Sequence, residues 1–155
     1  MKKMTLFIII LFTFLDQVIK YLVSSTNINS VLIPNVLSLK YAQNDGIAFS
    51  MLSGGRVLII ILSIILIYVL TVIVKNDYSK TNNKNMLLLS YGLLLSGIFG
   101  NLIDRIVRGV VVDYISINIF NYPFPIFNFA DMLITVGIII FIIVSFTNSK
   151  KEKHN

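Results

Sequence analysis

Hydrophobic residues are concentrated in four stretches of the chain, and polar residues separate them. Residues 57–74 and 86–103 are each runs of eighteen residues without a charged side chain, and about 18 to 20 such residues are needed to cross the hydrocarbon core of a bilayer. Residues 4–23 are as apolar but contain Asp16 and Lys20, and residues 129–147 reach this length if 129–131 form the first turn. The pattern predicts four transmembrane helices in one domain over residues 1–155.

A different periodicity occurs between the first two predicted helices. Residues 36–43 alternate between apolar and polar side chains, and Asn44-Asp45-Gly46 follows them. Alternation with a period of two is typical of a strand, and Asn, Asp and Gly are turn residues. We therefore expect an all-α integral membrane protein with a small extracytoplasmic β element.

The basic residues indicate the orientation in the membrane. Eight lysines precede the first helix, lie in the polar segment 75–85 or follow the fourth helix, whereas the opposite side has four basic residues: Lys40, Arg56, Arg105 and Arg108. Cytoplasmic loops carry the excess of positive charge, so we expect both termini in the cytoplasm, a solvated cytoplasmic loop at 75–85, and outward-facing loops at 24–55 and 106–130.

Composition agrees with a lipid environment. The chain is 56% hydrophobic and 13% charged, whereas soluble domains are about 45 to 50% apolar and about 25% charged. The net charge is +6, but most lysines lie on the predicted cytoplasmic side of the helices. We therefore attribute the charge to membrane topology and expect no nucleic-acid partner. Residues 1–14 would also suit a signal peptide, but Asp16 and Lys20 interrupt the end of that apolar run and no small-x-small cleavage site follows it.

Carboxylates at membrane depth are the main indication of function. The chain has seven acidic residues, and four of them lie in or at the rims of the apolar segments: Asp16, Asp104, Asp113 and Asp131. A charged side chain there costs roughly 3 kcal/mol or more, and such residues usually face the bundle interior and mark functional sites.

Two of these acids have nearby basic partners in sequence. Asp16 and Lys20 are four residues apart, which favours a helical ion pair, although Lys20 could instead extend to the membrane interface. Asn101, Asp104 and Arg105 share one helix face. Arg105 could pair with Asp104, with another carboxylate or with a lipid phosphate.

The other two acids suggest acid–base chemistry. Asn128 and Asp131 have the spacing of a helix N-cap and its third helical residue, but capping does not explain Asp113, which lies in an apolar stretch. Two carboxylates in a partly apolar site cannot both ionise easily, so one keeps a proton. Such a pair can hydrolyse a peptide bond, one member acting as base and the other as acid.

Other reaction classes fit the sequence less well. The single histidine, His154, lies in the charged tail, and there is no cysteine, so histidine or thiolate zinc sites and Ser-His-Asp triads are excluded. A carboxylate-bound Mg²⁺ is conceivable, but Arg105 among the acids would compete with it. We expect no cofactor and no metal.

Five short motifs in order resemble one family, the lipoprotein signal peptidases or signal peptidase II, which are bacterial inner-membrane aspartyl peptidases. These motifs are Asp16-Gln17-x-x-Lys20, Asn44-Asp45-Gly46-Ile47-Ala48-Phe49, Gly100-Asn101-Leu102-Ile103-Asp104-Arg105, Val111-Val112-Asp113-Tyr114 and Phe127-Asn128-Phe129-Ala130-Asp131. Each is weak alone, but five in order with four spans between them are highly specific. Ile47 stands where alanine is common in the family, a departure that concerns the packing of a mobile lid.

The resemblance implies that Asp113 and Asp131 are the catalytic pair. It also implies that eight residues bind substrate or support the site: Asp16, Lys20, Asn44, Gly46, Asn101, Asp104, Arg105 and Asn128. The implied substrate is a prolipoprotein whose cysteine carries diacylglycerol, cut before that cysteine. We expect a monomer in the bacterial cytoplasmic membrane, in contact with membrane lipids and with its active site at the outer face.

Two other functions would also use intramembrane charges. A small non-enzymatic transporter or proton-relay protein needs acids and a lysine in its helices, but the acids of this chain gather at one rim. A purely structural bundle that uses charges to fix helix register would leave the cost of burying them unexplained.

Overall fold

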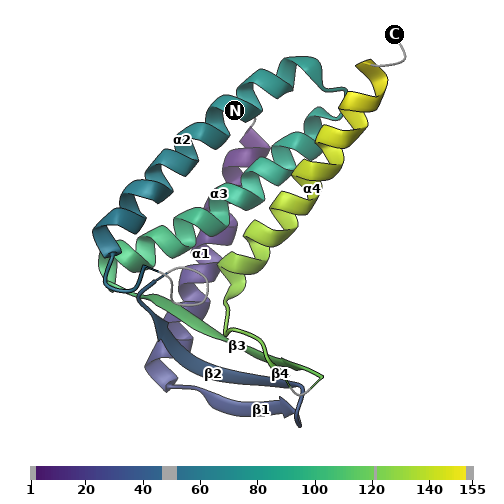
Figure 1. The fold of residues 1–155 in the computed structure, drawn as a ribbon. Coiled ribbons are helices and arrows are strands. Elements are labelled where there is room, and N and C mark those ends of the chain that lie inside the picture. Colours follow the sequence, from purple (N-terminus) through teal and green to yellow (C-terminus); the bar gives the residue numbers. More distant parts are fainter. Residues whose placement is uncertain (1–2, 47–51, 121, 153–155) are drawn as a thin grey trace.

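The computed structural model describes residues 3–46, 52–120 and 122–152, with side chains as far as residue 147. In this part of the chain, four long helices form a bundle with a small sheet at one end (Figure 1). The helices are α1 (Lys3–Thr26), α2 (Arg56–Lys80), α3 (Lys84–Val107) and α4 (Phe129–Glu152). Each contains a segment long and apolar enough to cross a membrane, as the hydrophobic pattern predicted.

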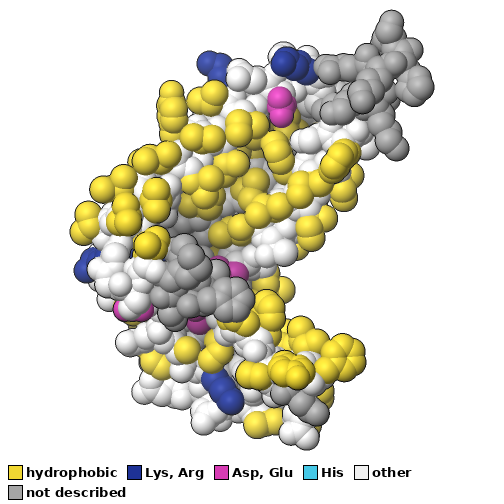
Figure 2. Space-filling view, viewed as in Figure 1, with side chains coloured by type: hydrophobic (Ala, Val, Ile, Leu, Met, Phe, Trp, Pro, Cys, Tyr) yellow, Lys and Arg dark blue, Asp and Glu magenta, His cyan; other side chains and the backbone are white. Residues whose placement is uncertain are grey.

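Helix α3 forms the centre of the bundle. Most of it is buried, whereas α1, α2 and α4 expose many large apolar side chains, including Phe7, Val57 and Phe146. Figure 2 shows hydrophobic side chains over much of the visible face of the bundle. Such an exterior suits helices that satisfy their backbone hydrogen bonds internally and face lipid.

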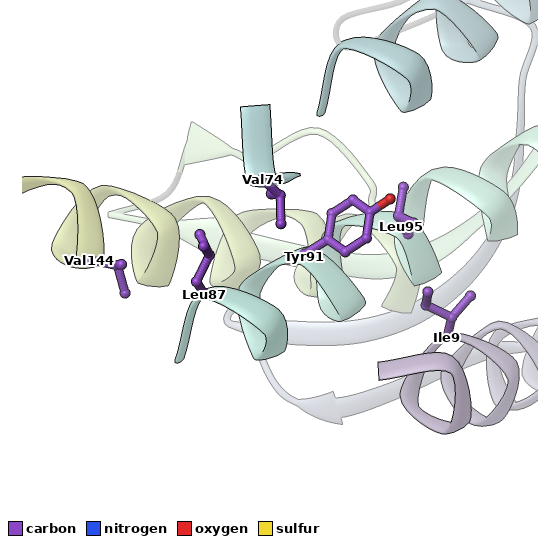
Figure 3. Packing of buried hydrophobic residues seen from close by; sticks show 6 residues of the cluster. All are labelled: Ile9, Val74, Leu87, Tyr91, Leu95 and Val144. Carbon is purple, nitrogen blue, oxygen red and sulfur yellow. The ribbon is translucent and has the colours of Figure 1, made fainter. Parts of the chain in front are cut away.

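The core between the helices draws on all four of them. Ile9, Val74, Leu87, Tyr91, Leu95 and Val144 form one buried cluster (Figure 3). The Tyr91 hydroxyl lies 2.8 Å from Thr71 Oγ1 of α2, so this polar atom has a partner inside the apolar core. The cluster fixes α3 against its neighbours away from the sheet.

Glycines allow close helix packing nearer the sheet. A Cβ atom at Gly97 would overlap the Ala130 carbonyl oxygen of α4, and one at Gly100 would overlap the Asp16 carboxylate of α1. Small residues let neighbouring backbones approach. Gly97 and Gly100 therefore bring α1 and α4 together on one end of α3.

The sheet is antiparallel throughout, with the order β1-β2-β3-β4. Its strands are β1 (Asn29–Ile33), β2 (Leu37–Asn44), β3 (Val111–Ile119) and β4 (Tyr122–Pro123). The predicted strand at 36–43 is confirmed as β2, and the bend at residues 45–46 follows it. A cluster of Val23, Val112 and Tyr114 packs β3 against the end of α1.

Both boundaries of the predicted loop at 75–85 are wrong. Residues 75–80 continue α2 and residues 84–85 begin α3, so the connection between these helices is only 81–83. The Thr81 amide donates to the Asp77 carbonyl at 2.9 Å, and Lys84 Nζ lies 5.3 Å from the centre of the Tyr78 ring. Polar residues can continue a helix because the backbone hydrogen bonds do not depend on side-chain hydropathy. A hydropathy pattern therefore underestimates the length of the helix.

The two ends of the helix bundle differ, and only one of them meets the sheet. The start of α1, the end of α2, the start of α3 and the end of α4 lie together, and the sheet lies at the other end (Figure 1). Helix α1 (Lys3–Thr26) continues well beyond residue 14, where the stretch that would also have suited a signal peptide ends. Its far end approaches the sheet and carries Asp16 and Lys20.

Candidate active site

Four carboxylates meet where the bundle joins the sheet. Asp16 comes from α1, Asp104 from α3, Asp113 from β3 and Asp131 from the first turn of α4. Acidic side chains are visible at this junction in Figure 2. The fold thus brings together the four acids that the sequence singled out.

Asp113 is held by two amide side chains. It lies opposite Ala42 in the β2–β3 pair and is 4% exposed. Asn44 Nδ2 donates to its Oδ2 at 3.1 Å, and Asn128 Nδ2 donates to its Oδ1 at 2.6 Å. Burial, followed by the nearby Asp131 carboxylate, raises the pKa of Asp113 to about 6, while the two amide hydrogen bonds oppose this rise.

Asp131 forms the capping box that its spacing predicted. The Asn128 backbone amide donates to Asp131 Oδ2, and the Asp131 backbone amide donates to Asn128 Oδ1, both at 3.0 Å. Asp131 Oδ1 accepts a further hydrogen bond of 2.8 Å from Asn101 Nδ2. Asp131 thus stands in the first turn of α4, a position where acidic residues are favoured.

Asn128 connects the two acids. Its side chain is fully buried, and it donates to Asp113 and accepts from the backbone of Asp131. The amide group therefore cannot rotate without losing one of these contacts. Asn128 fixes the relative position of the two carboxylates.

Lys20 satisfies a second group of buried atoms. Its Nζ lies 2.9 Å from Asp16 Oδ2, 2.9 Å from Asp104 Oδ2 and 2.9 Å from Asn101 Oδ1. The side chains of Lys20, Asp16 and Asp104 are all fully buried, and the three ammonium hydrogens match the three acceptors. The predicted Asp16–Lys20 ion pair is confirmed, and the alternative in which Lys20 reaches the membrane interface is wrong.

Asp16 also contacts α4. Its Oδ1 accepts a hydrogen bond of 3.0 Å from the Ala130 backbone amide, one of the amides that has no partner within the helix. Because Gly100 leaves room for this carboxylate, Asp16 joins α1 to the start of α4 across the surface of α3.

Arg105 connects α3 to the turn after β2. Its Nη2 donates to the Gly46 carbonyl at 2.6 Å and its Nη1 donates to the Asn101 carbonyl at 3.2 Å, while Nε is buried without a hydrogen bond among the described residues. Arg105 thus does not form the suggested ion pair with Asp104. Lys20 and Arg108 pair with Asp104 instead.

Asn44 and Gly46 shape the turn beside the acids. The Gly46 amide donates to Asn44 Oδ1 at 3.0 Å, so the Asn44 side chain both closes the turn and contacts Asp113. Residues 47–49 of the same motif, including the expectation for Ile47, lie outside the described residues.

Three residues at the site were given no role from the sequence, although Gln17 and Tyr114 stand within the motifs. Gln17 and Arg108 contact Asp104, and the Tyr114 hydroxyl accepts a hydrogen bond of 3.2 Å from the Phe129 amide at the start of α4. Burial raises the pKa of Tyr114, which keeps its hydroxyl protonated. The spacing of Asp104 and Arg108, four residues apart on a helix, was a usable signal for that pair.

Metal ligands are not grouped here in the usual way. Across residues 3–46, 52–120 and 122–152, no three Asp, Glu, His or Cys side chains are arranged to hold a metal ion. The acids are instead bonded to amide and cationic donors. Such a site can hold carboxylates with different proton affinities close to each other.

Four membrane-length helices around a buried carboxylate site define a polytopic membrane protein whose carboxylates are suited to acid–base chemistry. Residues 8–147 match the family model described as Signal peptidase (SPase) II. The chain belongs to the signal peptidase II family. Since this is a protease family, the chain is an enzyme, which sets aside the transporter and purely structural alternatives.

Individual relatives agree with this assignment. The chain is 38% identical to a lipoprotein signal peptidase of Staphylococcus aureus (strain bovine RF122 / ET3-1), over 89% of this chain and 86% of the relative. It is 39% identical to that of strain JH9, with the same coverage.

Solved structures agree as well. A bacterial membrane enzyme determined by the in meso method at 2.3 Å resolution is similar with a TM-score of 0.85 and 34% identity, over 98% of this chain and 93% of that one. A second, at 1.9 Å, gives a TM-score of 0.78 and 36% identity over 90% of both chains.

Proposed function

We propose that this protein is an aspartyl endopeptidase that removes the signal peptide from diacylglyceryl-modified prolipoproteins and cuts before the lipidated cysteine. Asp113 and Asp131 are its catalytic pair. The observation that carries the proposal is that both carboxylates accept hydrogen bonds from one buried residue, Asn128: Asp113 from its side chain and Asp131 from its backbone amide. Relatives named lipoprotein signal peptidases support the substrate class.

The environments of the two acids favour different roles. Both oxygens of Asp131 accept hydrogen bonds, from the Asn128 amide and from the Asn101 side chain, at the N-terminus of α4, whereas burial raises the pKa of Asp113. Asp131 therefore begins as the general base and Asp113 as the acid.

The reaction then needs one water and one shared proton. Asp131 takes a proton from the water while the water oxygen attacks the peptide carbonyl carbon, and Asp113 gives its proton to the carbonyl oxygen. When the tetrahedral intermediate collapses, Asp131 gives its new proton to the leaving amine of the cysteine, and Asp113 recovers a proton from the intermediate's hydroxyl. The peptide bond breaks, and both acids return to their starting states.

Neighbouring residues hold these groups in place. Asn44, Asn101 and Asn128 donate to the two carboxylates. The ion pairs of Lys20 with Asp16 and Asp104 join α1 to α3. Arg105 holds the turn at Gly46. None of these contacts requires a cofactor.

The charge pattern supports an outward-facing site. The described lysines at the α1 start and around the α2–α3 connection lie at the end opposite the sheet, and basic residues favour the cytoplasmic side. Both termini are then cytoplasmic, and the carboxylates lie at the outer face of the bacterial cytoplasmic membrane. A site at this rim can leave the acyl chains of the substrate in lipid while the adjacent peptide bond reaches the acids. One chain contains the whole site, so the protein acts as a monomer.

The experiment that tests the substrate compares two forms of one precursor. Purified protein is incubated with a diacylglyceryl-modified prolipoprotein and with the same precursor lacking the lipid, and cleavage is followed by gel mobility and mass spectrometry. We expect the lipidated form to be cut before its cysteine and the other to be cut poorly. Equal cleavage of the two forms would contradict the proposed substrate.

A further inference from the structure

Arg108 lies just beyond α3 and reaches back to the buried acid Asp104. Its Nη1 forms an ion pair with Asp104 Oδ1 and donates to Gln17 Oε1 at 2.8 Å. Gln17 Nε2 lies 3.2 Å from the same Asp104 oxygen and 3.0 Å from the Gly100 carbonyl. The Arg108 side chain is 26% exposed, whereas that of Asp104 is fully buried. Arg108 and Gln17 therefore hold Asp104 from the outer side of the cluster.

The second oxygen of Asp104 holds the strand that carries Asp113. Asp104 Oδ2 accepts a hydrogen bond of 3.2 Å from the Val112 backbone amide, and Val112 immediately precedes Asp113. The Asp104 carbonyl also accepts from the Arg108 amide at 2.7 Å and the Gly109 amide at 3.1 Å. Asp104 thus fixes both ends of the turn from α3 into β3.

Glycine makes this turn possible. Gly109 has a φ of +86°, a left-handed conformation that glycine adopts without a steric cost. The chain reverses there within a few residues. The Asp104 carboxylate then meets the start of β3 at Val112.

The local charge balance explains why an arginine is needed. Lys20 is shared between two fully buried carboxylates, Asp16 and Asp104. One cation cannot balance both, and an uncompensated buried charge is strongly unfavourable. Arg108 supplies the second cation at Asp104, whose other carboxylate oxygen accepts the Val112 amide.

We propose that Arg108 is a positioning residue for Asp113 that acts through Asp104 and the Val112 amide. The inference rests on the proposed catalytic role of Asp113. Loss of Arg108 loosens the start of β3, so Asp113 moves relative to Asp131. Small misplacements of reacting groups lower the rate of the chemical step while substrate binding is kept.

The test compares Arg108→Met, Arg108→Lys and a matched control, Lys40→Met. Lys40 is an exposed cation on β2 at the same end of the molecule. With the lipidated precursor, we expect Arg108→Met to lower kcat by about 10- to 100-fold with KM unchanged. Arg108→Lys should recover most of the rate because lysine can still pair with Asp104, and Lys40→Met should match the wild type.

Hydrogen exchange gives a readout that does not depend on turnover. Mass spectrometry of peptides that cover residues 110–114 should show faster amide exchange in Arg108→Met than in the wild type or Lys40→Met. If Arg108→Met does not fold, Gln17→Leu removes the other half of the outer contact without a charge change, and it should give a smaller loss of kcat and faster exchange in the same peptides.

Several results would overturn the inference. One is an unchanged kcat in the folded Arg108→Met variant or, if that variant does not fold, in Gln17→Leu. The others are a change confined to KM, no recovery of the rate by Arg108→Lys, and unchanged amide exchange at residues 110–114. Asp113→Asn, assayed in parallel, separates this inference from the proposed function. An inactive Asp113→Asn with a fully active Arg108→Met refutes the inference alone, whereas an active Asp113→Asn refutes the proposed function.

Discussion

Asn128 and Asp131 hold each other through two hydrogen bonds of 3.0 Å, each from the backbone amide of one residue to the side chain of the other. This pair begins α4. Because the Asn128 amide nitrogen also donates to Asp113, the contact that starts the helix sets the arrangement of the two acids as well. A common capping motif has become part of a candidate catalytic site.

Replacing Lys20 by methionine should destabilise the protein strongly. Asp16 and Asp104 would lose their shared buried cation, and breaking such a pair costs about 3 to 5 kcal/mol. Thermal unfolding in detergent, followed by circular dichroism, should show a large drop in the midpoint. Lys40→Met is the control and should unfold like the wild type; an equally stable Lys20→Met variant would show that the buried ion pairs contribute little.

The stability gained by replacing Asp113 with asparagine should depend on pH. Burial and the nearby Asp131 raise the pKa of Asp113 to about 6, so the folded state holds a proton that the unfolded chain releases near pH 4. The wild type therefore loses stability as the pH rises from about 4 to 6, by at most about 3 kcal/mol. Asp113→Asn lacks this loss, and its advantage in unfolding midpoint should grow over that window; a constant difference would contradict the raised pKa.

Cleavage should survive the removal of metal ions. Asn44, Asn101 and Asn128 donate hydrogen bonds to the Asp113 and Asp131 carboxylates, and hydrolysis by a carboxylate pair needs no Lewis acid. The rate should be the same before and after dialysis against EDTA. Loss of activity that Mg²⁺ or Mn²⁺ restores would reassign the acids as ligands.

Cysteine labelling should place the two ends of the bundle on opposite sides of the membrane. The chain has no cysteine of its own, so single cysteines at Asn82, between α2 and α3, and at Phe120, between β3 and β4, can be labelled separately. A membrane-impermeant maleimide added to intact cells should modify Phe120→Cys, and Asn82→Cys should react after the cells are opened. Modification of both in intact cells would contradict the proposed orientation.

The sequence predicted the spans and the acids well because both follow from the cost of placing polar groups in lipid. Eighteen uncharged residues identify a span regardless of its neighbours, and a carboxylate such as Asp113 in an apolar stretch needs a partner. The end of α2 at Lys80 was missed because polar residues also continue helices. Sequence spacing suggested Arg105 as one partner of Asp104, although the four-residue spacing of Asp104 and Arg108 would have indicated Arg108 as well. The contact of Asp104 with Val112 depends on the turn at Gly109, which only the structure shows.

Cleavage of the lipidated precursor by the Asp113→Asn and Asp131→Asn variants tests the central claim most directly. Asp77→Asn, on α2 at the end of the bundle away from the sheet, is the control and should keep full activity. Since an amide can neither take the water's proton nor supply one, each catalytic variant should lose at least about 10²- to 10⁴-fold in rate while remaining folded, and the double variant should be scarcely slower than either single one. Substantial cleavage by either folded single variant would contradict the carboxylate pair.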